Sequence, residues 1–370
     1  MKLKRILGWT ALSIPLIGVA FLFVAYWMSD NACGEGVSGL AAGPVKAITY
    51  CDYGTAEVLR LEGIEKPVPA DDQILVRIAA AAINPLDWHY MRGSPYAMRL
   101  MSGLRRPKEL RLGVDYSGTV EAVGRKVTRF KPGDAVFGGR TGALAEYVVA
   151  RESGGVALKP DNLTFEQAAG VPVAAITALQ ALRKAGVQPG ERVLVNGASG
   201  GVGTFTVQIA KALGAHVTGV CSTRNVELVR SLGADDVIDY KQDDYTAGAA
   251  RFDVIIDNVG NHPLLANRRA LEDDGRYILI GGGGPEDGQW IGPMIKPLKA
   301  LLLRPFVSQR MEFMLADLNP EDLAYLGELM QAGKVTPVID RRYPLRETPE
   351  AIRYLETGRA RGKVIITVDS

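Results

Sequence analysis

The glycine-rich segment Gly197–Gly203 has the residue types that could approach a phosphate group closely. It follows an apolar stretch, Arg192–Asn196, and leads into a predicted helix, Thr204–Leu213, and a second apolar stretch, His216–Cys221. Glycines let the main chain turn tightly, and a helix N-terminus presents unpaired N–H groups to a negative charge. The strand, loop, helix and second strand together predict dinucleotide binding. The predicted contacts in this loop are Ala198, Ser199, Gly200, Gly201 and Val202.

The residues after the second strand indicate which dinucleotide binds. An acidic side chain there would accept hydrogen bonds from a free ribose 2′-hydroxyl and would repel a 2′-phosphate. This sequence has Cys221 at that position, followed by Ser222, Thr223 and Arg224. Hydroxyl groups can donate to phosphate, and a guanidinium is a planar cation that matches phosphate oxygens. We therefore predict NADP(H) rather than NAD(H); the alternative is that Arg224 only opens a solvated helix.

Two further turns follow apolar strands farther along the chain. Asn258 and Val259 end one predicted strand, and Gly281 and Gly282 end the next. In a parallel sheet, the carboxyl ends of the strands line the ligand crevice. We expect these four residues to flank the nicotinamide half of the cofactor, although plain turn chemistry would also explain them.

The elements that must position these residues form two patterns. From Val45 the chain has short strands separated by turns, which is typical of a partly closed β-barrel. Beyond Thr164, apolar strands alternate with amphipathic helices, which indicates an α/β fold with a doubly wound parallel sheet. Near the C-terminus we predict a strand at Val335–Ile339, a helix at Pro349–Thr357 and a strand at Lys363–Val368.

Composition excludes some classes of protein. The 370 residues include 43 lysines and arginines against 41 aspartates and glutamates, a net charge of +2, so the sequence gives no reason to expect a nucleic-acid partner. Hydrophobic residues make up 47% of the chain, which is enough for a large core. Two basic, apolar segments, 99–111 and 293–314, are candidates for contact with a membrane, with solvated loops and helix faces or subunit contacts as the alternatives, and a homodimer stays open.

The N-terminal segment predicts a membrane anchor. Ile6–Met28 contains no charged side chain and, as a helix, would span roughly 34 Å, enough for a bilayer core. We expect a single-pass transmembrane helix within residues 1–29 and a linker at 30–44, with a cleaved signal peptide as the alternative. Lys2, Lys4 and Arg5 place the catalytic body outside by the positive-inside rule, whereas a dinucleotide is expected mainly in the cytosol. The side of the membrane stays open.

Several motifs in the same order resemble one enzyme family. They are Ala82–Asp87, Gly113–Gly118, Phe130–Asp134, Ala198–Gly203, Gly233–Tyr240 and Gly362–Val364. From Val45 to the C-terminus the chain resembles the medium-chain dehydrogenase/reductase superfamily. Within that superfamily it is similar to the zinc-independent quinone oxidoreductases, a group that includes the reticulon-interacting mitochondrial oxidoreductase. The resemblance implies a GroES-like barrel domain, residues 45–167 and 312–370, around a Rossmann domain, residues 168–311.

The family's zinc ligands are replaced in this chain. Their positions correspond to Asn84, Val114 and about Val173, none of which offers zinc a thiolate or imidazole, so we expect no metal. Hydride addition to a simple ketone builds a strongly basic alkoxide that zinc would stabilise, whereas a quinone gives a phenolate-like anion and an enone gives a delocalised enolate. The predicted function is therefore NADPH-dependent reduction of a small-molecule quinone or α,β-unsaturated carbonyl. The alternative is a non-catalytic NADPH-binding sensor or interaction protein.

The resemblance also implies roles for single residues. Asn84 is expected beside the nicotinamide as an amide donor to the substrate oxygen, or else is a turn residue. His89 stands where related reductases often carry a tyrosine, and with the weaker candidate Tyr90 it is a candidate to donate a proton or hydrogen-bond the substrate. Tyr240 joins Ser222 and Arg224 in the family's 2′-phosphate pocket. Lys363 matches a position near the cofactor, or else is a solvated lysine.

Overall fold

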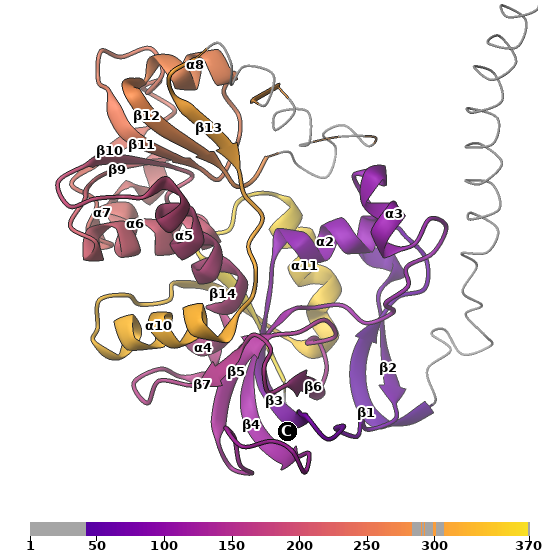
Figure 1. Cartoon of the computed structure of the whole chain (residues 1–370). Helices are drawn as coiled ribbons and strands as arrows, with labels where there is room; N and C mark the ends of the chain where they lie inside the picture. Colours follow the sequence, from indigo (N-terminus) through magenta and orange to yellow (C-terminus); the bar gives the residue numbers. More distant parts are fainter. Residues whose placement is uncertain (1–41, 283–289, 291, 293–298, 301–306, 369–370) are drawn as a thin grey trace, which may run out of the picture.

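The computed structural model describes residues 42–282, 290, 292, 299–300 and 307–368. Two large sheets, one of six strands and one of seven, form two domains that lie side by side, and a two-stranded ribbon flanks the second (Figure 1). This arrangement confirms the predicted combination of a Rossmann-type sheet with a GroES-like barrel.

The six-stranded sheet is entirely parallel and has the order β10-β9-β8-β11-β12-β13. From β8 the chain adds β9 and β10 on one side, and then returns to add β11, β12 and β13 on the other side. In such a sheet, the crevice at the carboxyl ends of β8 and β11 is the expected ligand site. Its strands are β8 (Arg192–Asn196), β9 (His216–Cys221), β10 (Asp236–Asp239), β11 (Phe252–Asp257), β12 (Leu271–Leu279) and β13 (Arg310–Phe313). Its helices are α5 (Pro172–Ala185), α6 (Gly201–Ala212), η3 (Thr223–Asn225), α7 (Val226–Ser231), α8 (Leu264–Arg269) and α10 (Pro320–Gln331).

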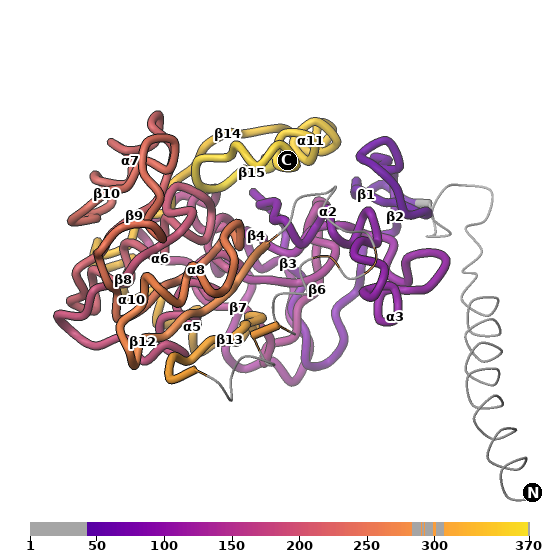
Figure 2. Tube along the Cα trace, turned by 90° about the horizontal axis from the view of Figure 1, so that it is seen from above, coloured from indigo at the N-terminus to yellow at the C-terminus, as the bar shows by residue number. Residues whose placement is uncertain are grey.

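The second sheet combines segments from both ends of the chain. Its order is β14-β15-β3-β4-β5-β7, with β6 paired to β3. The strands are β3 (Gln73–Ile83), β4 (Asp115–Val123), β5 (Ala135–Gly139), β6 (Tyr147–Arg151), β7 (Val156–Leu158), β14 (Ile339–Pro344) and β15 (Lys363–Thr367). The C-terminal strand β15 pairs antiparallel with β3 and places Val364 opposite Ile83. Figure 2 shows β14, β15 and α11 (Thr348–Glu356) together along one side of the molecule.

The remaining elements lie around the barrel. They are β1 (Ala42–Thr49), η1 (Ala56–Val58), β2 (Arg60–Ile64), α2 (Pro85–Arg92), η2 (Tyr96–Met98), α3 (Arg99–Ser102), α4 (Phe165–Ala169) and η6 (Leu345–Glu347). Thr164 begins α4 as predicted, because its hydroxyl accepts a hydrogen bond from the Gln167 N–H in a capping box.

Helix α5 joins the cores of the two domains. Ten of its fourteen residues are buried, and the helix contacts β4 and β5 of the barrel as well as β11 and β12 of the parallel sheet. Its alanines allow close approach on several sides, so the helix fits between the two sheets. The two domains therefore share a packed boundary, and the ligand crevice opens beside it.

Two expectations from the sequence are wrong. The strand predicted at Val335–Ile339 instead begins at Ile339, two residues after Pro337, whose ring nitrogen has no hydrogen to donate to a sheet. The prediction of a single-pass membrane protein is also wrong: in the part of the chain that the structure describes, no helix has the length and apolar character needed to cross a bilayer. The segment Ile6–Met28 and the proposed linker up to residue 41 lie outside the described residues, as does part of 293–314.

The first turn of α2 buries a carboxyl group. Asp87 is 1% exposed, and one of its oxygens accepts a hydrogen bond of 2.7 Å from the backbone N–H of Asn84. Burial raises the pKa of Asp87 to about 7, an effect that the Asn84 hydrogen bond and the nearby Lys363 only partly offset. This carboxyl therefore titrates near neutral pH.

We expect Asp87→Asn to flatten the pH dependence of stability. The folded pKa lies above the unfolded value, so the protonated form stabilises the fold fully below about pH 4, and this contribution is lost as the pH rises through 7. The full effect would be up to about 4 kcal/mol. Denaturant unfolding between pH 5 and 8 should show a smaller fall in the free energy of unfolding for Asp87→Asn than for wild type. The exposed Asp161→Asn is the control; parallel wild-type and Asp87→Asn curves would contradict the assignment.

Candidate cofactor-binding and active site

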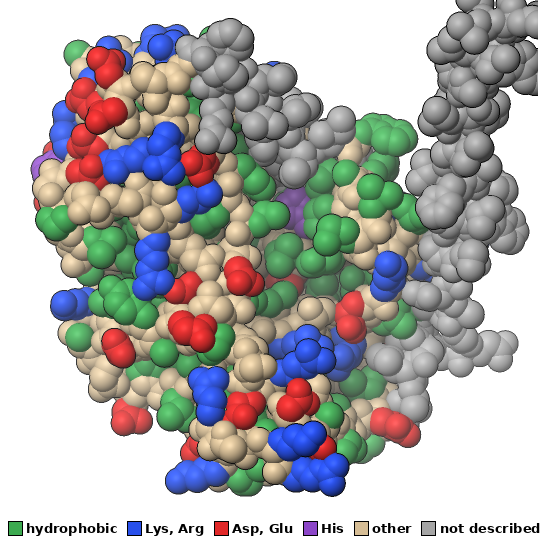
Figure 3. Space-filling view, viewed as in Figure 1, with side chains coloured by type: hydrophobic (Ala, Val, Ile, Leu, Met, Phe, Trp, Pro, Cys, Tyr) green, Lys and Arg blue, Asp and Glu red, His purple; other side chains and the backbone are tan. Residues whose placement is uncertain are grey.

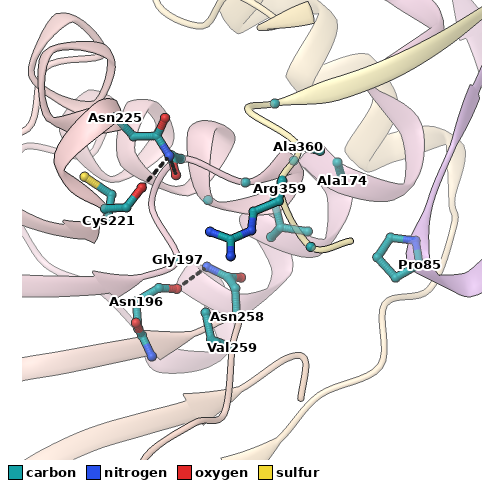
Figure 4. Close-up of a pocket in the computed structure, with 18 of the residues that line it drawn as sticks. Pro85, Ala174, Asn196, Gly197, Cys221, Asn225, Asn258, Val259, Arg359 and Ala360 are labelled. Carbon is teal, nitrogen blue, oxygen red and sulfur yellow. Dashed lines mark hydrogen bonds between the residues drawn. The ribbon is translucent and has the colours of Figure 1, made fainter. Parts of the chain in front are cut away.

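A pocket of about 550 Å³ lies where the parallel sheet meets the barrel (Figure 4). Figure 3 shows a hollow between the two domains with hydrophobic side chains gathered along it. Loops at the ends of four parallel strands and two segments of the barrel line the pocket. The lining includes Gly197, Ser199–Gly203, Ser222, Arg224, Asn225, Tyr240, Asn258, Val259, Asn261, Asn84, Pro85, Leu355, Gly358–Ala360, Gly362 and Lys363.

The glycine loop approaches the pocket with its main chain. Gly197 has a φ of +78°, and a Cβ on Gly203 would lie 2.1 Å from the Gly197 carbonyl oxygen, so larger residues do not fit there. Gly200 precedes the first turn of α6, whose amide hydrogens are free of helical partners. Ala198 does not line the pocket: it is fully buried, and its N–H donates to the Val220 carbonyl.

The ends of β9 and β10 form the wall where the sequence predicted a 2′-phosphate. Ser222, Arg224 and Tyr240 all line the pocket. Thr223 instead hydrogen-bonds Asp239, and this bond holds the pKa of that carboxyl below its usual range. Burial, reinforced by Asp239, raises the pKa of the Cys221 thiol to about 11, so Cys221 stays protonated at neutral pH and is not a reactive thiolate.

A buried network organises the ends of β8 and β11. The Asp257 carboxylate accepts hydrogen bonds from the Asn196 side chain at 2.8 Å, the Val259 and Gly260 amides, and the Tyr277 hydroxyl at 2.7 Å. The Asn258 side chain in turn donates to the Asn196 carbonyl at 3.0 Å. The turn that carries Asn258 and Val259 is therefore fixed in place.

Gly281 and Gly282 lie next to the turn that carries Asn258 and Val259. A Cβ on Gly281 would lie 2.5 Å from the Asn258 carbonyl oxygen, so the glycine packs against the turn. Neither glycine lines the pocket. Their placement supports the position of Asn258, while their predicted contact with the cofactor stays a prediction.

The lining has the polarity that a dinucleotide requires. The buried side-chain oxygens of Asn225 and Asn258 have no hydrogen-bond partner among the described residues. Both lie in the pocket wall, where a ribose hydroxyl or a carboxamide could donate to them. The described lining contains three cations, Arg224, Arg359 and Lys363, and no acidic side chain. The residues present therefore fit NADP(H) or NAD(H).

A buried ion pair stands at the barrel side of the pocket. The Lys363 ammonium lies 2.5 Å from Asn84 Oδ1 and 3.3 Å from Asp115 Oδ2, and the side chains of Lys363 and Asp115 are 3% and 0% exposed. Asn84 Nδ2 donates to the same Asp115 oxygen at 2.9 Å, and the other Asp115 oxygen accepts from the Val173 N–H at 3.0 Å. Burial raises the pKa of Asp115, and Lys363 opposes that shift. Four separate segments thus meet in one network.

This network does not fit a zinc ion. Asn84 and Asp115 face a lysine ammonium, a cation that already fills the position where their oxygens converge. Val114 and Val173 supply no donor side chain. In the described ranges, no cluster of three or more histidine, cysteine or acidic residues has the arrangement of a metal site.

The structure does not bring His89 or Tyr90 into the pocket. His89 stacks on Trp88, and its Nδ1 lies 2.6 Å from the Ser94 carbonyl, so Nδ1 carries the hydrogen. Burial lowers the pKa of His89, which leaves the ring neutral with a lone pair on Nε2. Such a ring accepts rather than donates at Nε2. Tyr90 lines a second cavity of about 210 Å³ together with Asp87.

Three residues of the site were missed by the sequence analysis. Asn225 lies directly after Arg224, so extending the predicted run Ser222–Arg224 by one residue would have included it. Asp115 is the charged residue within the family motif Gly113–Gly118, a signal that was available in the sequence, and it lies in the buried first half of β4. Arg359 comes from the turn before β15, and no local pattern indicates that this turn reaches the pocket.

The chain matches two family models and many known proteins. Residues 70–161 match the alcohol dehydrogenase GroES-like domain, and residues 232–366 match the zinc-binding dehydrogenase domain. The chain is 36% identical to 2-methylene-furan-3-one reductase of Solanum lycopersicum over 337 residues, which cover 87% of this chain and 79% of the relative. It is 37% identical to the mitochondrial NAD(P)H oxidoreductase RTN4IP1 of Bos taurus over 354 residues, with 85% and 87% covered.

Solved structures agree. The quinone oxidoreductase of Coxiella burnetii superimposes with a TM-score of 0.77 at 32% identity, and the match covers 88% of this chain and 99% of that one. The resemblance inferred from the motifs is therefore confirmed. The chain is an oxidoreductase and belongs to the medium-chain dehydrogenase/reductase superfamily.

Proposed function

We propose that the protein is a zinc-independent oxidoreductase that transfers hydride from NADPH to a quinone or an α,β-unsaturated carbonyl. One observation carries this proposal: a single pocket has a cation, Arg224, beyond the glycine loop and an Asn84–Asp115–Lys363 network, which offers zinc no suitable set of ligands, at its other end. The first feature favours a phosphorylated ribose. The second favours an acceptor that needs no Lewis acid. The quinone- and enone-related names of several relatives support the same class of substrate.

Residues on two walls of the pocket would hold different parts of the cofactor. The amides of Gly200–Val202 would hold the bridging phosphates, and Ser222 and Arg224 would hold a 2′-phosphate. Asn225 and Asn258 would accept hydrogen bonds from hydroxyl or amide groups with their unpartnered oxygens. The bound nicotinamide supplies a hydride to the acceptor. Because the pocket is shared with the barrel, a substrate would enter between Asn84 and the nicotinamide end.

Asn84 is oriented to donate a hydrogen bond. Its Oδ1 accepts from the Lys363 ammonium, and one of its two Nδ2 hydrogens goes to Asp115. The other hydrogen remains for a substrate oxygen. An amide whose oxygen binds a cation is polarised and donates more strongly from its nitrogen. Lys363 is therefore proposed as a positioning residue, and Asn84 as the donor that stabilises charge developing on the acceptor oxygen. The roles of His89 and Tyr90 stay predictions.

The proposal is tested by NADPH oxidation with a panel of quinones and enones. We expect turnover with these acceptors and no loss of activity after treatment with a metal chelator, because a lysine ammonium holds the place that zinc would need. Turnover of simple alcohols or ketones alone, abolished by the chelator, would contradict the proposal. Tight NADPH binding with no turnover on any acceptor would contradict hydride transfer but retain the cofactor site.

Arg224→Gln should change the cofactor preference. Losing one charge-assisted contact should weaken NADPH binding by roughly ten- to a hundredfold and leave NADH binding within about twofold. Calorimetric dissociation constants for both nucleotides measure this. Arg230→Gln, an exposed arginine on α7, is the control and should change neither. An equal loss for NADH would show that Arg224 acts only on the structure of the loop.

A comparison of the single variant Lys363→Met with the double variant Lys363→Met/Asp115→Asn should separate the effect of Lys363 on stability from its effect on catalysis. The single change leaves Asp115 buried without its partner and should lower the free energy of unfolding by roughly 3–5 kcal/mol. The double change leaves neither member of the pair charged and should recover part of that loss. Both variants should show kcat lower by roughly 10- to 100-fold, since the Asn84 amide is no longer held.

Denaturant unfolding, NADPH calorimetry and steady-state rates are measured on the same samples of these variants. We expect the double variant to bind NADPH within about threefold of wild type, because glycine-loop amides and Arg224 remain. A double variant that recovers full kcat together with its stability would reduce Lys363 to a structural role.

A further inference from the structure

A second cavity, of about 210 Å³, lies in the barrel domain. Helices α2 and α3 contribute part of its lining, and the segment 108–114, which leads into β4, contributes another part. This segment is held against the end of β1, because the Tyr50 N–H donates to the Leu110 carbonyl at 2.9 Å. The linings of this cavity and of the cofactor pocket have no described residue in common, so the two are separate sites.

Tyr50 brings a buried hydroxyl group to this cavity. The residue is 3% exposed, and its hydroxyl interacts electrostatically with Asp87, Tyr90 and Glu109, which line the same cavity. Burial raises the pKa of Tyr50, so the group keeps its hydrogen and acts as a donor. Among the residues that the structure describes, none forms a hydrogen bond with this hydroxyl. A buried donor without a partner is unfavourable, so its partner must come from the contents of the cavity.

Asp87 supplies the complementary acceptor. It is 1% exposed, and one of its oxygens accepts a hydrogen bond from the Asn84 N–H at 2.7 Å. The backbone of Gly113 also stabilises its ionised form. An ionised carboxylate has about four acceptor positions and no donor, so acceptor capacity is left for a group in the cavity. A hydrogen-bond donor therefore fits beside Asp87, while an acceptor fits beside Tyr50.

Among common ligand groups, a hydroxyl meets both requirements. A carbonyl or ether oxygen would accept from Tyr50 but would give Asp87 no hydrogen. An ammonium group would donate to Asp87 but has no lone pair for Tyr50. A carboxylate would place a second negative charge next to Asp87, and like charges in a buried site repel each other strongly. The two residues thus select a ligand that donates and accepts through the same oxygen atom.

The rest of the lining favours an aromatic ring as the body of the ligand. Leu112 and Val114 are 2% and 8% exposed and form an apolar part of the wall. The Tyr90 ring and the Met101 thioether also line the cavity, and both groups pack well against aromatic rings. The cavity is smaller than the roughly 300–1,000 Å³ that is usual for larger ligands, so it suits a single ring. A phenolic hydroxyl, with a pKa of about 10, is also a stronger donor to a carboxylate than the hydroxyl of an aliphatic alcohol.

We propose that the second cavity binds a small phenol, which accepts a hydrogen bond from Tyr50 and donates one to Asp87, with its ring against the apolar wall. Because the site is separate from the cofactor pocket, this inference goes beyond the proposed hydride transfer and holds with or without a bound dinucleotide. A reduced quinone is itself a phenol, so the proposed reaction would supply a ligand of this class. Asp87 also accepts from the Asn84 N–H, so a bound phenol would contact a residue that helps to position Asn84.

Calorimetry with phenol and with toluene tests the proposal, on the whole chain without dinucleotide at pH 8. At that pH most of the Asp87 carboxyl is ionised. Toluene has the same shape as phenol, with a methyl group in place of the hydroxyl. Wild type should bind phenol at least about tenfold more tightly than toluene, because toluene would leave Tyr50 and Asp87 without partners.

Two variants locate the hydroxyl of the phenol. Tyr50→Phe removes one neutral hydrogen bond and should weaken phenol binding roughly three- to tenfold, whereas Asp87→Asn replaces a charged acceptor with a neutral one and should weaken it by roughly tenfold. Both variants should bind toluene within about twofold of wild type. Tyr325→Phe, on α10 and outside both cavities, is the matched control and should bind both ligands as wild type does. Thermal unfolding shows which variants are folded, and either of the first two decides the question without the other.

Equal phenol binding by wild type, Tyr50→Phe and Asp87→Asn would overturn the proposal, since phenol would then occupy another site, such as the acceptor end of the cofactor pocket. An equal loss of phenol and toluene in these variants would also overturn it, because the hydroxyl would not be the group that is recognised. No phenol binding by wild type would overturn it too and would leave the cavity to water.

These results can be told apart from a failure of the proposed function. If wild type turns over quinones with NADPH but does not bind phenol in the second cavity, only this inference fails. If phenol binds with the expected pattern among the variants but no acceptor is turned over, the proposed function fails and the second site remains.

Discussion

The buried pair of Lys363 and Asp115 is the constraint on which the site depends. Two charges removed from water are retained only when their geometry is good and their remaining hydrogen-bonding groups are satisfied. Here the ammonium contacts Asn84 and Asp115, and Asp115 also accepts from Asn84 and from the backbone of α5. The pair therefore specifies where β15, β4, the start of α2 and the start of α5 must meet. A displacement of β15 or β4 would break the ion pair, and a displacement of either helix start would remove a hydrogen bond from a buried charged group.

That constraint explains why the C-terminal segment returns to the barrel. β15 pairs with β3, which lies far earlier in the sequence, and this pairing places Lys363 in the pocket wall. The turn before it delivers Arg359 and makes a hydrogen bond with the glycine loop. One short segment thus carries two of the cationic side chains that line the pocket. The two domains are coupled through a site rather than through packing alone.

Local features of this fold could be predicted from sequence, and long-range ones could not. The glycine loop and Ser222 and Arg224 were found because each depends on a strand end and a few neighbouring residues. The pairing of Lys363 with Asp115 depends on residues 248 positions apart, which no local pattern connects. His89 and Tyr90 were inferred from a family position alone, while their contacts depend on how α2 turns: Tyr90 lines the second cavity and His89 meets Ser94.

In the proposed function, the same network sets which acceptors suit the site. A zinc ion would polarise an oxygen directly and stabilise an alkoxide, whereas Lys363 would act through the Asn84 amide, and much of its charge is already balanced by Asp115. An amide donor provides far less stabilisation than a divalent cation, so the anion that forms must be weakly basic. Quinones and conjugated carbonyls meet this condition because their anions are delocalised. Selectivity for soft acceptors would then follow from the ion pair that holds the fold together, rather than from the shape of the pocket alone.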